Sequence, residues 1–295
     1  MKKYLICSFI ILAFYANGQN DLLALLEDSS GIKPKEQVYA TFKTTRIINL
    51  PSVENTAPGV FDFKIGHRFG FLNSGVKEFF GLDQASMRLG GEFGITRNFM
   101  VGIGRSTFEK TIDGYFKWVI VRQTTGAGSF PFTISAFASS AIKTLNTNPD
   151  RQYFISNNLF YVGQLLVGTK LSNSFSLQLS PTLVHRNLTQ TRAEKNDVLA
   201  IGAGGRIKLT KRTSLNAEYV YLLPGQIASD FKPSLSVGFD IETGGHVFQL
   251  HATNSTSMIE KGYITETVGD WAKGGIHFGF NISRVFTIKK QKVKK

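Results

Sequence analysis

The sequence has one cysteine, Cys7, in 295 residues, and it lies within the apolar stretch formed by residues 4–15. If that stretch is removed, the remaining chain has no thiol, which excludes disulfides and thiol chemistry. No later apolar run approaches the roughly 20 residues that a membrane-spanning helix requires. The sequence therefore does not describe a disulfide-stapled secreted domain or a helical membrane protein.

The first residues have the layout of a secretory leader. Lys2 and Lys3 precede the apolar stretch, and the small residues 16–18 precede Gln19. This arrangement predicts a signal peptide spanning residues 1–18. Cys7 lies inside the apolar stretch and not after it, which argues against a lipid anchor. We therefore expect an exported chain.

The formal net charge is +13, and its densest basic cluster is the tail at residues 287–295. A basic surplus can indicate nucleic-acid binding, but the sequence has no recognition motif for nucleic acid. An exported basic protein meets lipid headgroups and lipopolysaccharide phosphates first. We therefore expect outer-membrane lipid or lipopolysaccharide as a partner, and no nucleic acid.

The strongest pattern is a two-residue alternation of apolar and polar side chains. In residues 234–242, Leu235, Val237, Phe239 and Ile241 alternate with small or charged residues. Successive side chains of a strand point to opposite faces, so one face is apolar and the other polar. The pattern recurs in residues 60–69, 87–95, 175–183, 201–209 and 276–283, and is weak in residues 115–123 and 153–170.

Short connections alternate with long ones along the chain. Turn-sized connections at residues 96–98, 172–174, 210–213 and 243–245 separate longer ones such as residues 70–83 and 255–273. Together with the alternation, this predicts an all-β fold, an antiparallel transmembrane β-barrel of about 12 strands with both termini in the periplasm. The expected divisions are a leader (1–18), an arm or possible plug (19–59), the barrel (60–286) and a basic periplasmic tail (287–295).

Residues 40–49 are strand-like but polar on both faces. They would either plug the lumen or extend the base of the barrel, and the sequence does not decide between these. The strand phase predicts a set of charged and histidine side chains in the lumen. Neighbouring strands could pair these charges as a structural network, or the charges could line a selective path. The predicted lumen residues are Asp62, Lys64, Arg68, Arg88, Glu92, Arg206, Lys208, Glu218, Asp240, Glu242, His251 and His277.

Catalytic and metal-binding patterns are weak. None of the five histidines is followed two positions later by serine, which would place both side chains on one face of a strand. His251 and Thr253 come nearest to that arrangement. The histidines also lack metal-ligand spacing. We predict no catalytic residue, no metal site and no cofactor.

Five segments, residues 40–54, 62–70, 79–106, 258–271 and 278–286, have a familiar sequence, as in FFGLDQASMRLGGEFGITRNFMVGIGRS and FGFNISRVF. The chain resembles a family of uncharacterised membrane-bound beta-barrel proteins of Gram-negative outer membranes. The resemblance extends over nearly all of the chain after the leader. It implies a barrel in the outer membrane, and it implies no activity or functional residue.

The sequence thus predicts a monomeric outer-membrane barrel that is a narrow pore or transport component for small solutes or ions, and not an enzyme. One alternative is a closed structural barrel that anchors partners through its loops or arm. Another is an integral outer-membrane lipid hydrolase.

Overall fold

The computed structural model describes residues 34–145, 154–189, 191 and 194–289. The predicted leader (1–18) and residues 290–295 of the basic tail lie outside the described residues. Across the described part of the chain, no helix is long and apolar enough to cross a bilayer.

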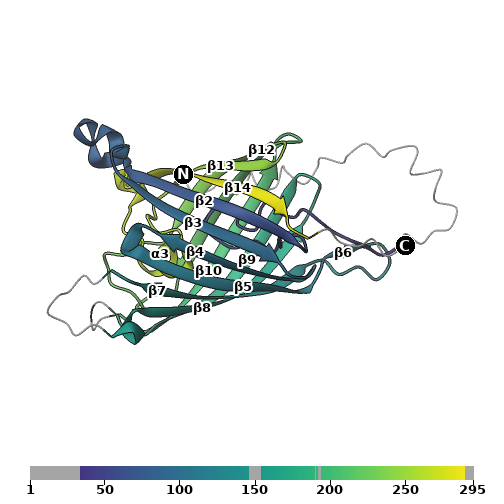
Figure 1. The fold of residues 1–295 in the computed structure, drawn as a ribbon, viewed down its shortest axis with the longest axis horizontal. Coiled ribbons are helices and arrows are strands. Elements are labelled where there is room, and N and C mark those ends of the chain that lie inside the picture. Colours follow the sequence, from purple (N-terminus) through teal and green to yellow (C-terminus); the bar gives the residue numbers. More distant parts are fainter. Residues whose placement is uncertain (1–33, 146–153, 190, 192–193, 290–295) are drawn as a thin grey trace, which may run out of the picture.

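Twelve antiparallel strands form one closed barrel (Figure 1). Each pairs with its neighbours in the chain, and the last strand pairs with the first, Ile282 opposite Ile65. The prediction of about 12 antiparallel strands is confirmed. The wall strands are β2 (Val60–Phe71), β3 (Ala85–Gly94), β4 (Phe99–Ser106), β5 (Thr111–Val121), β7 (Thr133–Lys143), β8 (Leu159–Lys170), β9 (Phe175–Arg186), β10 (Asp197–Lys208), β11 (Thr213–Leu222), β12 (Leu235–Thr243), β13 (His246–Thr253) and β14 (His277–Thr287).

Side chains alternate between the two faces of the wall. In β9, Leu177, Leu179 and Leu183 are exposed on the outer surface. Ser176 and Gln178, on either side of Leu177, are buried inside. The outer surface of the barrel is therefore apolar while its interior holds most of the polar side chains, as the two-residue period requires.

The two ends of the barrel differ. At one end, here called the turn end, the connections at residues 95–98, 171–174 and 209–212 are short. In each, a hydroxyl oxygen, that of Thr96, Ser172 or Thr210, accepts hydrogen bonds from backbone N–H groups two and three residues later. Such side-chain bonds stabilise tight turns.

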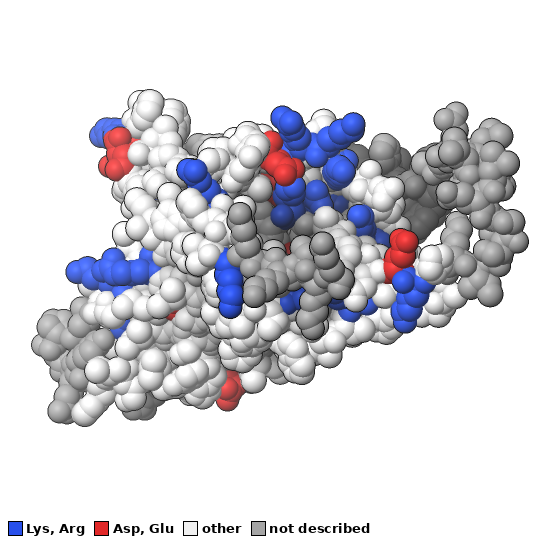
Figure 2. Space-filling model, turned by 45° about the vertical axis from the view of Figure 1, so that its right-hand side comes forward, with Lys and Arg blue, Asp and Glu red and all other residues white. Residues whose placement is uncertain are grey.

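Basic side chains gather at the turn end, which comes forward in Figure 2. Exposed basic residues there include Arg97, Lys208, Lys211, Arg212, Arg284 and Lys289. The opposite end, called the loop end, carries the longer connections. Short helical turns lie in these connections at Leu72–Ser74, Val76–Gly81, Phe108–Lys110, Ile155–Asn158 and Trp271–Lys273.

The segment before β2 lies inside the barrel. Strand β1 (Glu36–Gln37) pairs with β6 (Thr124–Thr125) at the turn end, and the chain then enters the lumen. Residues 41–56, here called the plug, are mostly buried and fold back on themselves, with a bridge between Arg46 and Pro51. The plug is not a strand of the wall. The alternative in which residues 40–49 extend the base of the barrel is therefore not what the structure has.

The loop end is also filled. Residues 254–267, here called the inward loop, are nearly all buried and contain the helix α3 (Glu260–Thr265). The plug, the inward loop and the wall share one cluster of buried apolar side chains. From the plug it contains Phe42, Ile47, Leu50 and Val53; from the inward loop Tyr263 and Ile264; and from the wall Met100, Tyr115, Phe137, Val162, Leu166, Val184, Val198, Ala200, Val220 and Leu222.

Candidate functional site, the plugged lumen

Apolar plug side chains fit against glycines of the wall. A Cβ atom built on Gly204 would lie 2.3 Å from Cδ1 of Ile47, and one on Gly202 would lie 2.8 Å from Cδ2 of Leu50. A Cβ on Gly168 would lie 2.9 Å from Val53. Because glycine in a strand leaves room for a close neighbour, these positions are sockets that only glycine leaves open.

The carboxylate of Glu218 in β11 holds the tip of the plug. Its two oxygens accept hydrogen bonds from the backbone N–H groups of Ile48 (3.1 Å), Asn49 (2.8 Å) and Leu50 (2.9 Å). Consecutive N–H groups that converge in this way form an anion-binding concavity. Hydrogen bonds to an ionised acceptor are about twice as strong as neutral ones, so Glu218 is a principal anchor of the plug.

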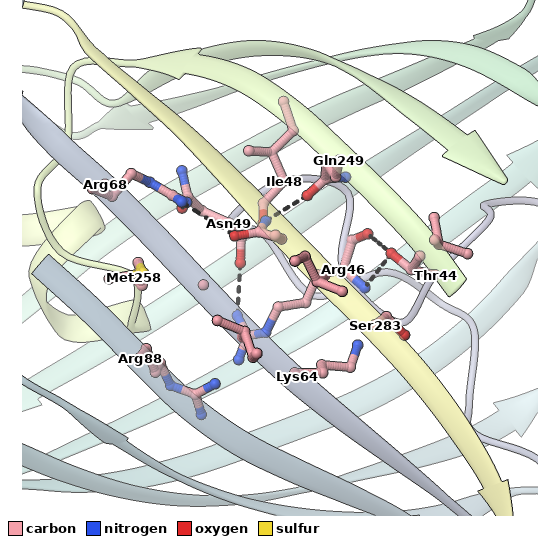
Figure 3. Close-up of a pocket in the computed structure, with 15 residues that line it drawn as sticks. Thr44, Arg46, Ile48, Asn49, Lys64, Arg68, Arg88, Gln249, Met258 and Ser283 are labelled. Carbon is pink, nitrogen blue, oxygen red and sulfur yellow. Dashed lines mark hydrogen bonds between the residues drawn. The ribbon is translucent and has the colours of Figure 1, made fainter. Parts of the chain in front are cut away.

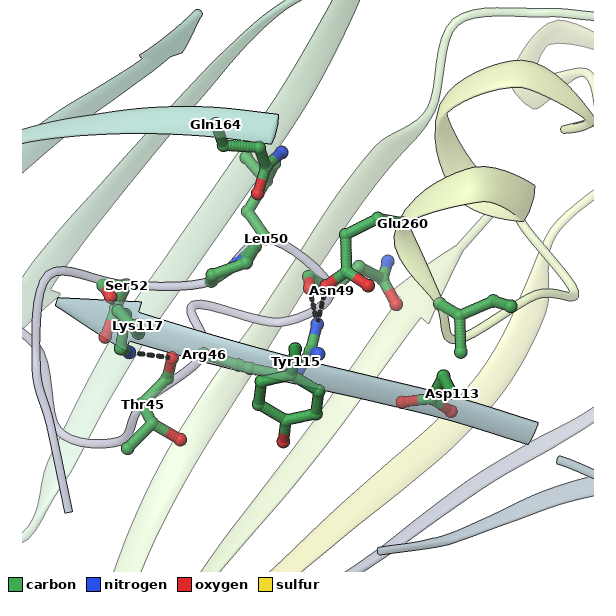
Figure 4. A network of polar contacts seen from close by, with 12 residues as sticks. Thr45, Arg46, Asn49, Leu50, Ser52, Asp113, Tyr115, Lys117, Gln164 and Glu260 are labelled. Carbon is green, nitrogen blue, oxygen red and sulfur yellow. Dashed lines mark hydrogen bonds and ion pairs between the residues drawn. The ribbon is translucent and has the colours of Figure 1, made fainter. Parts of the chain in front are cut away.

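Other wall side chains take up the remaining backbone groups of the plug. Lys117 in β5 donates to the carbonyls of Thr45 (3.2 Å) and Ser52 (2.8 Å) (Figure 4). Gln178 in β9 accepts from Val53 N–H (2.9 Å) and donates to Pro51 O (2.7 Å). Buried backbone groups outside a sheet need such partners. Side chains of the wall therefore supply the hydrogen bonds that a neighbouring strand would supply in a sheet.

Arg46 links the plug to the inward loop. Its Nη1 atom lies 2.7 Å from Glu260 Oε1 and donates to Asn49 O at 2.7 Å (Figure 4). Its guanidinium lies over the ring of Tyr115, 5.4 Å from the centroid. The two segments that fill the lumen from opposite ends are thus joined by a buried ion pair.

Glu92 in β3 is the centre of a second polar cluster. It accepts from Tyr115 OH (2.7 Å) and from Thr45 Oγ1 of the plug (2.6 Å), and it pairs with Lys64 of β2 at 3.1 Å. Asp62 lies 3.4 Å from the same ammonium group. This cluster fixes the plug to the first two strands of the barrel.

Ion pairs also hold the inward loop in place. Lys261 lies 3.0 Å from Glu109 and 2.5 Å from Glu266, and Glu109 also pairs with Lys143 at 2.5 Å. Burial opposes the charge on Lys261, but Glu266 and Glu109 outweigh it and raise its pKa above the ordinary value. Lys261 is therefore a cation that fastens the inward loop to the β4–β5 connection.

The structure brings several of the predicted lumen residues together. Eight of the twelve are buried. Arg88 contacts both oxygens of Asp113, and Glu242 pairs with Lys43 of the plug at 2.5 Å. The eight buried residues are Asp62, Arg68, Arg88, Glu92, Glu218, Asp240, His251 and His277.

The other predicted lumen residues lie toward the turn end or are half-buried. Arg206 donates to the carbonyl of Ala40 at 3.2 Å, Lys64 and Glu242 are half-buried, and Lys208 is exposed at the end of β10. Asp240 accepts from Gln249 at 2.7 Å.

Sequence reasoning missed Asp113 and Lys117, both in β5. Their strand alternates, with Ile112, Phe116 and Trp118 exposed on the outer face. Tyr115 and Val119 on the inner face are large or apolar, which obscured the alternation in the sequence. The regular spacing of the exposed residues was the signal that could have identified the inner face.

The histidine contacts of the described residues do not complete a catalytic arrangement. His185 Nδ1 lies 2.7 Å from Asp197 Oδ1 with both side chains exposed, but no described hydroxyl group hydrogen-bonds its other ring nitrogen. Both ring nitrogens of His251 are buried and have no hydrogen-bond partner among the described residues, and the Thr253 hydroxyl instead accepts from Ser236 at 2.8 Å. His277 lies 2.9 Å from Thr256 Oγ1, but its other nitrogen contacts a backbone carbonyl, Phe69 O, and not a carboxylate. Within the described residues no cluster of three metal-ligating side chains occurs.

Comparison with known proteins gives two kinds of match. No curated protein matches the sequence. The NanC porin is similar in structure at 7% identity and a TM-score of 0.47, with 76% of this chain and 98% of that chain covered. The KdgM porin is similar at 9% identity and a TM-score of 0.46, with 77% of this chain and 99% of that chain covered. The outer membrane protein Omp33 of Acinetobacter baumannii is similar at 10% identity and a TM-score of 0.39, with 77% of this chain and 97% of that chain covered.

The sequence itself matches the family described as "Membrane bound beta barrel domain (DUF5777)" over residues 42–286. The match includes the plug as well as nearly all of the wall. It confirms the resemblance predicted from the sequence. The closed, even-stranded antiparallel wall with its apolar outer surface is the architecture of outer-membrane barrels. The chain therefore belongs to this family of membrane-bound β-barrel domains and is a protein of the bacterial outer membrane.

Proposed function

We propose that the protein is a transport component of the outer membrane. Its narrow pore is closed by the plug together with the inward loop, which Arg46 joins to the plug, and it opens when the plug leaves the lumen and releases that loop. The observation that carries this proposal is that the ladder of the wall closes without the plug. Strand β14 pairs directly with β2. Near the plug, the bridge between Pro58 and Gly94 joins the chain to the wall. Displacing residues 41–56 would therefore leave the barrel intact.

The plug is held too firmly to leave often. Burial of its four apolar side chains contributes about 1.5–3 kcal/mol each, on the order of 6–12 kcal/mol in total. Each 1.4 kcal/mol changes a population about tenfold, so the open state would be rarer than roughly one molecule in 10⁴. The resting barrel is closed, and opening needs an external action on the plug.

The orientation follows from the two ends. Short turns face the periplasm and longer loops face outward in barrels of this type. The turn end, where β1 pairs with β6 and the chain enters the lumen, would then be periplasmic. An action on the arm before residue 41 would reach the plug from that side.

Planar-bilayer recording tests the proposal. A chain that begins at Pro58 lacks the plug, and a control chain that lacks only residues 19–33 keeps it. We expect the full chain and the control to be silent, and the plug-free chain to show stepwise conductance. A folded plug-free barrel without conductance, or full-size steps from the full chain, would contradict the proposal.

A second candidate is a permanently closed barrel that serves partners through its loops or arm. The apolar cluster that unites plug, wall and inward loop favours it, because such a cluster resembles a protein core more than a water-filled path. Silence of the folded plug-free barrel would select this candidate.

We also infer that the barrel does not act as a lipid hydrolase. A nucleophile would need a base held by a third group. Asp197 holds His185, but within the described residues no serine or threonine hydroxyl hydrogen-bonds that histidine. The purified protein should release no fatty acid or lysophospholipid from phospholipid vesicles. Release that is abolished in a His185→Ala or a His277→Ala variant would overturn this inference.

A further inference from the structure

A small cavity lies between the plug and strands β2, β3, β13 and β14 (Figure 3). Its volume is about 50 Å³. Four cationic side chains line it, Arg46 from the plug and Lys64, Arg68 and Arg88 from the wall. Among the described residues no aspartate or glutamate lines it. The cavity therefore presents positive charge from both the plug and the wall.

Arg68 is the one of these four cations that forms no ion pair among the described residues; the Glu218 carboxylate acts on it only from beyond ion-pair distance. Lys64 pairs with Glu92 and Asp62, Arg88 with Asp113, and Arg46 with Glu260. Arg68 is 1% exposed and forms no ion pair with any described carboxylate.

The bonds of Arg68 go to neutral oxygens, His67 O (2.9 Å), Asn281 Oδ1 (3.1 Å) and Asn49 Oδ1 (2.8 Å). A buried charge without a partner of opposite sign is costly. An anion in the cavity beside Arg68 would offset that cost.

Two guanidinium nitrogens of residues that line the cavity are also left without acceptors among the described residues. Nη2 of Arg46 and Nε of Arg68 are buried and have no hydrogen-bond partner within the described residues. One belongs to the plug and the other to the wall. Buried donors of this kind usually have a partner.

We propose that this cavity binds one small free oxyanion that bridges the plug and the wall. A volume of this size holds roughly three or four water molecules, which matches an anion of phosphate or sulfate size. Guanidinium groups are suited to planar or tetrahedral oxyanions because they donate in a fixed fork. Larger phosphate esters, including lipid headgroups, exceed the cavity. The site is formed in the closed barrel, so it does not depend on whether the plug ever moves.

Calorimetry on the full chain tests the site. The protein is kept in neutral detergent with sodium gluconate as background salt, and sodium phosphate, sodium sulfate or glycerol 3-phosphate is titrated in. We expect saturable one-to-one binding of phosphate and sulfate, and none of glycerol 3-phosphate. Equal binding of glycerol 3-phosphate would overturn the assignment to a small free anion.

Variants locate the site. Arg68→Gln and Arg46→Gln should each weaken sulfate binding at least tenfold, since each removes one charged donor group. Arg212→Gln, the same substitution at an exposed position of the turn end, should leave affinity within twofold. Unchanged affinity in both of the first two variants would overturn the proposal.

A measurement on the unmodified chain decides the case even where a variant does not fold. Crystals soaked in sodium selenate should show an anomalous selenium peak in the cavity, between Arg46 and Arg68. No saturable binding to the folded full chain, or selenium peaks only outside the cavity, would overturn the proposal. A lack of conductance in planar bilayers would contradict the transport proposal but not the anion-binding proposal.

Discussion

At the scale of single residues, the closed state depends on a few wall positions that match the plug atom for atom. Glu218 receives three backbone N–H groups, and Gly202, Gly204 and Gly168 leave space for three apolar side chains. None of these roles can be read from the sequence. A glutamate in the inner phase of a strand predicts a lumen charge, but not that backbone donors of a distant segment surround it.

Replacing the charge at Glu218 should loosen the plug. Glu218→Gln keeps the shape of the side chain but weakens three charge-assisted bonds, worth about 1.5–3 kcal/mol each at most. In a chain produced without residues 1–18, which contain Cys7, Ser52→Cys provides a unique thiol. We expect this thiol to react with a maleimide at least tenfold faster when Glu218→Gln is also present. Glu78→Gln, at an exposed loop position, is the control, and equal rates in both backgrounds would count against the anchor.

Filling a socket should expel the plug. Gly204→Leu places a side chain where Ile47 lies, while the strand can accept leucine. The variant should fold as a barrel and show conductance steps that the unmodified chain lacks. Gly163→Leu is the matched control because a Cβ there meets no atom within 4 Å. Silence of a folded Gly204→Leu barrel would show that the plug tolerates the intrusion.

At the scale of elements, the sequence predicts strands well wherever the inner face is polar. It does so poorly in β5 and β8, and the structure gives the reason. Their inner faces carry apolar or aromatic residues, among them Tyr115, Val119, Val162 and Leu166. These pack inside a lumen filled by protein, so apolar residues alternate with the polar ones on the inner face and the two-residue period weakens. The weak alternation thus records a filled interior.

The outer face of the strands gives a depth-dependent prediction. Leu179, near the middle of β9, and Leu209, beside the turn end, are similarly exposed, 55% and 54%. An arginine costs about 2–4 kcal/mol at the middle of the bilayer and about 0–1 kcal/mol near its surfaces. Urea unfolding in lipid vesicles should therefore show Leu179→Arg as the more destabilising of the two. Equal costs would mean that the lipid boundary lies elsewhere on the wall.

At the scale of the whole molecule, the barrel could be predicted from the sequence but its filling could not. Alternation, short turns and the absence of a long apolar helix together define the wall. The plug has no period of its own because it lies across the interior and bonds to side chains of β3, β5, β9, β11 and β13. The polar sequence of residues 40–49 was therefore equally consistent with a plug and with an extension of the base of the barrel.

Removing the plug should lower the thermal stability of the barrel without unfolding it. The chain that begins at Pro58 loses the apolar burial of the plug, but it keeps every strand pair of the wall. We expect it to retain the heat-dependent gel migration of a folded barrel and to lose that migration at a lower temperature than the full chain. An unfolded product would show that the plug is required for the wall itself.

The position of the plug in the chain has a consequence for biogenesis. Residues 41–56 come directly before β2, and β2 forms the seam with the last strand, β14. A growing ribbon of strands can curl around this segment and exclude water as it does so, before the first and last strands meet. We expect the plug to serve as a core around which the barrel closes. Refolding into vesicles should therefore be slower for the chain that begins at Pro58 than for the full chain. Equal refolding rates would show that the plug enters the barrel only after β2 and β14 have paired.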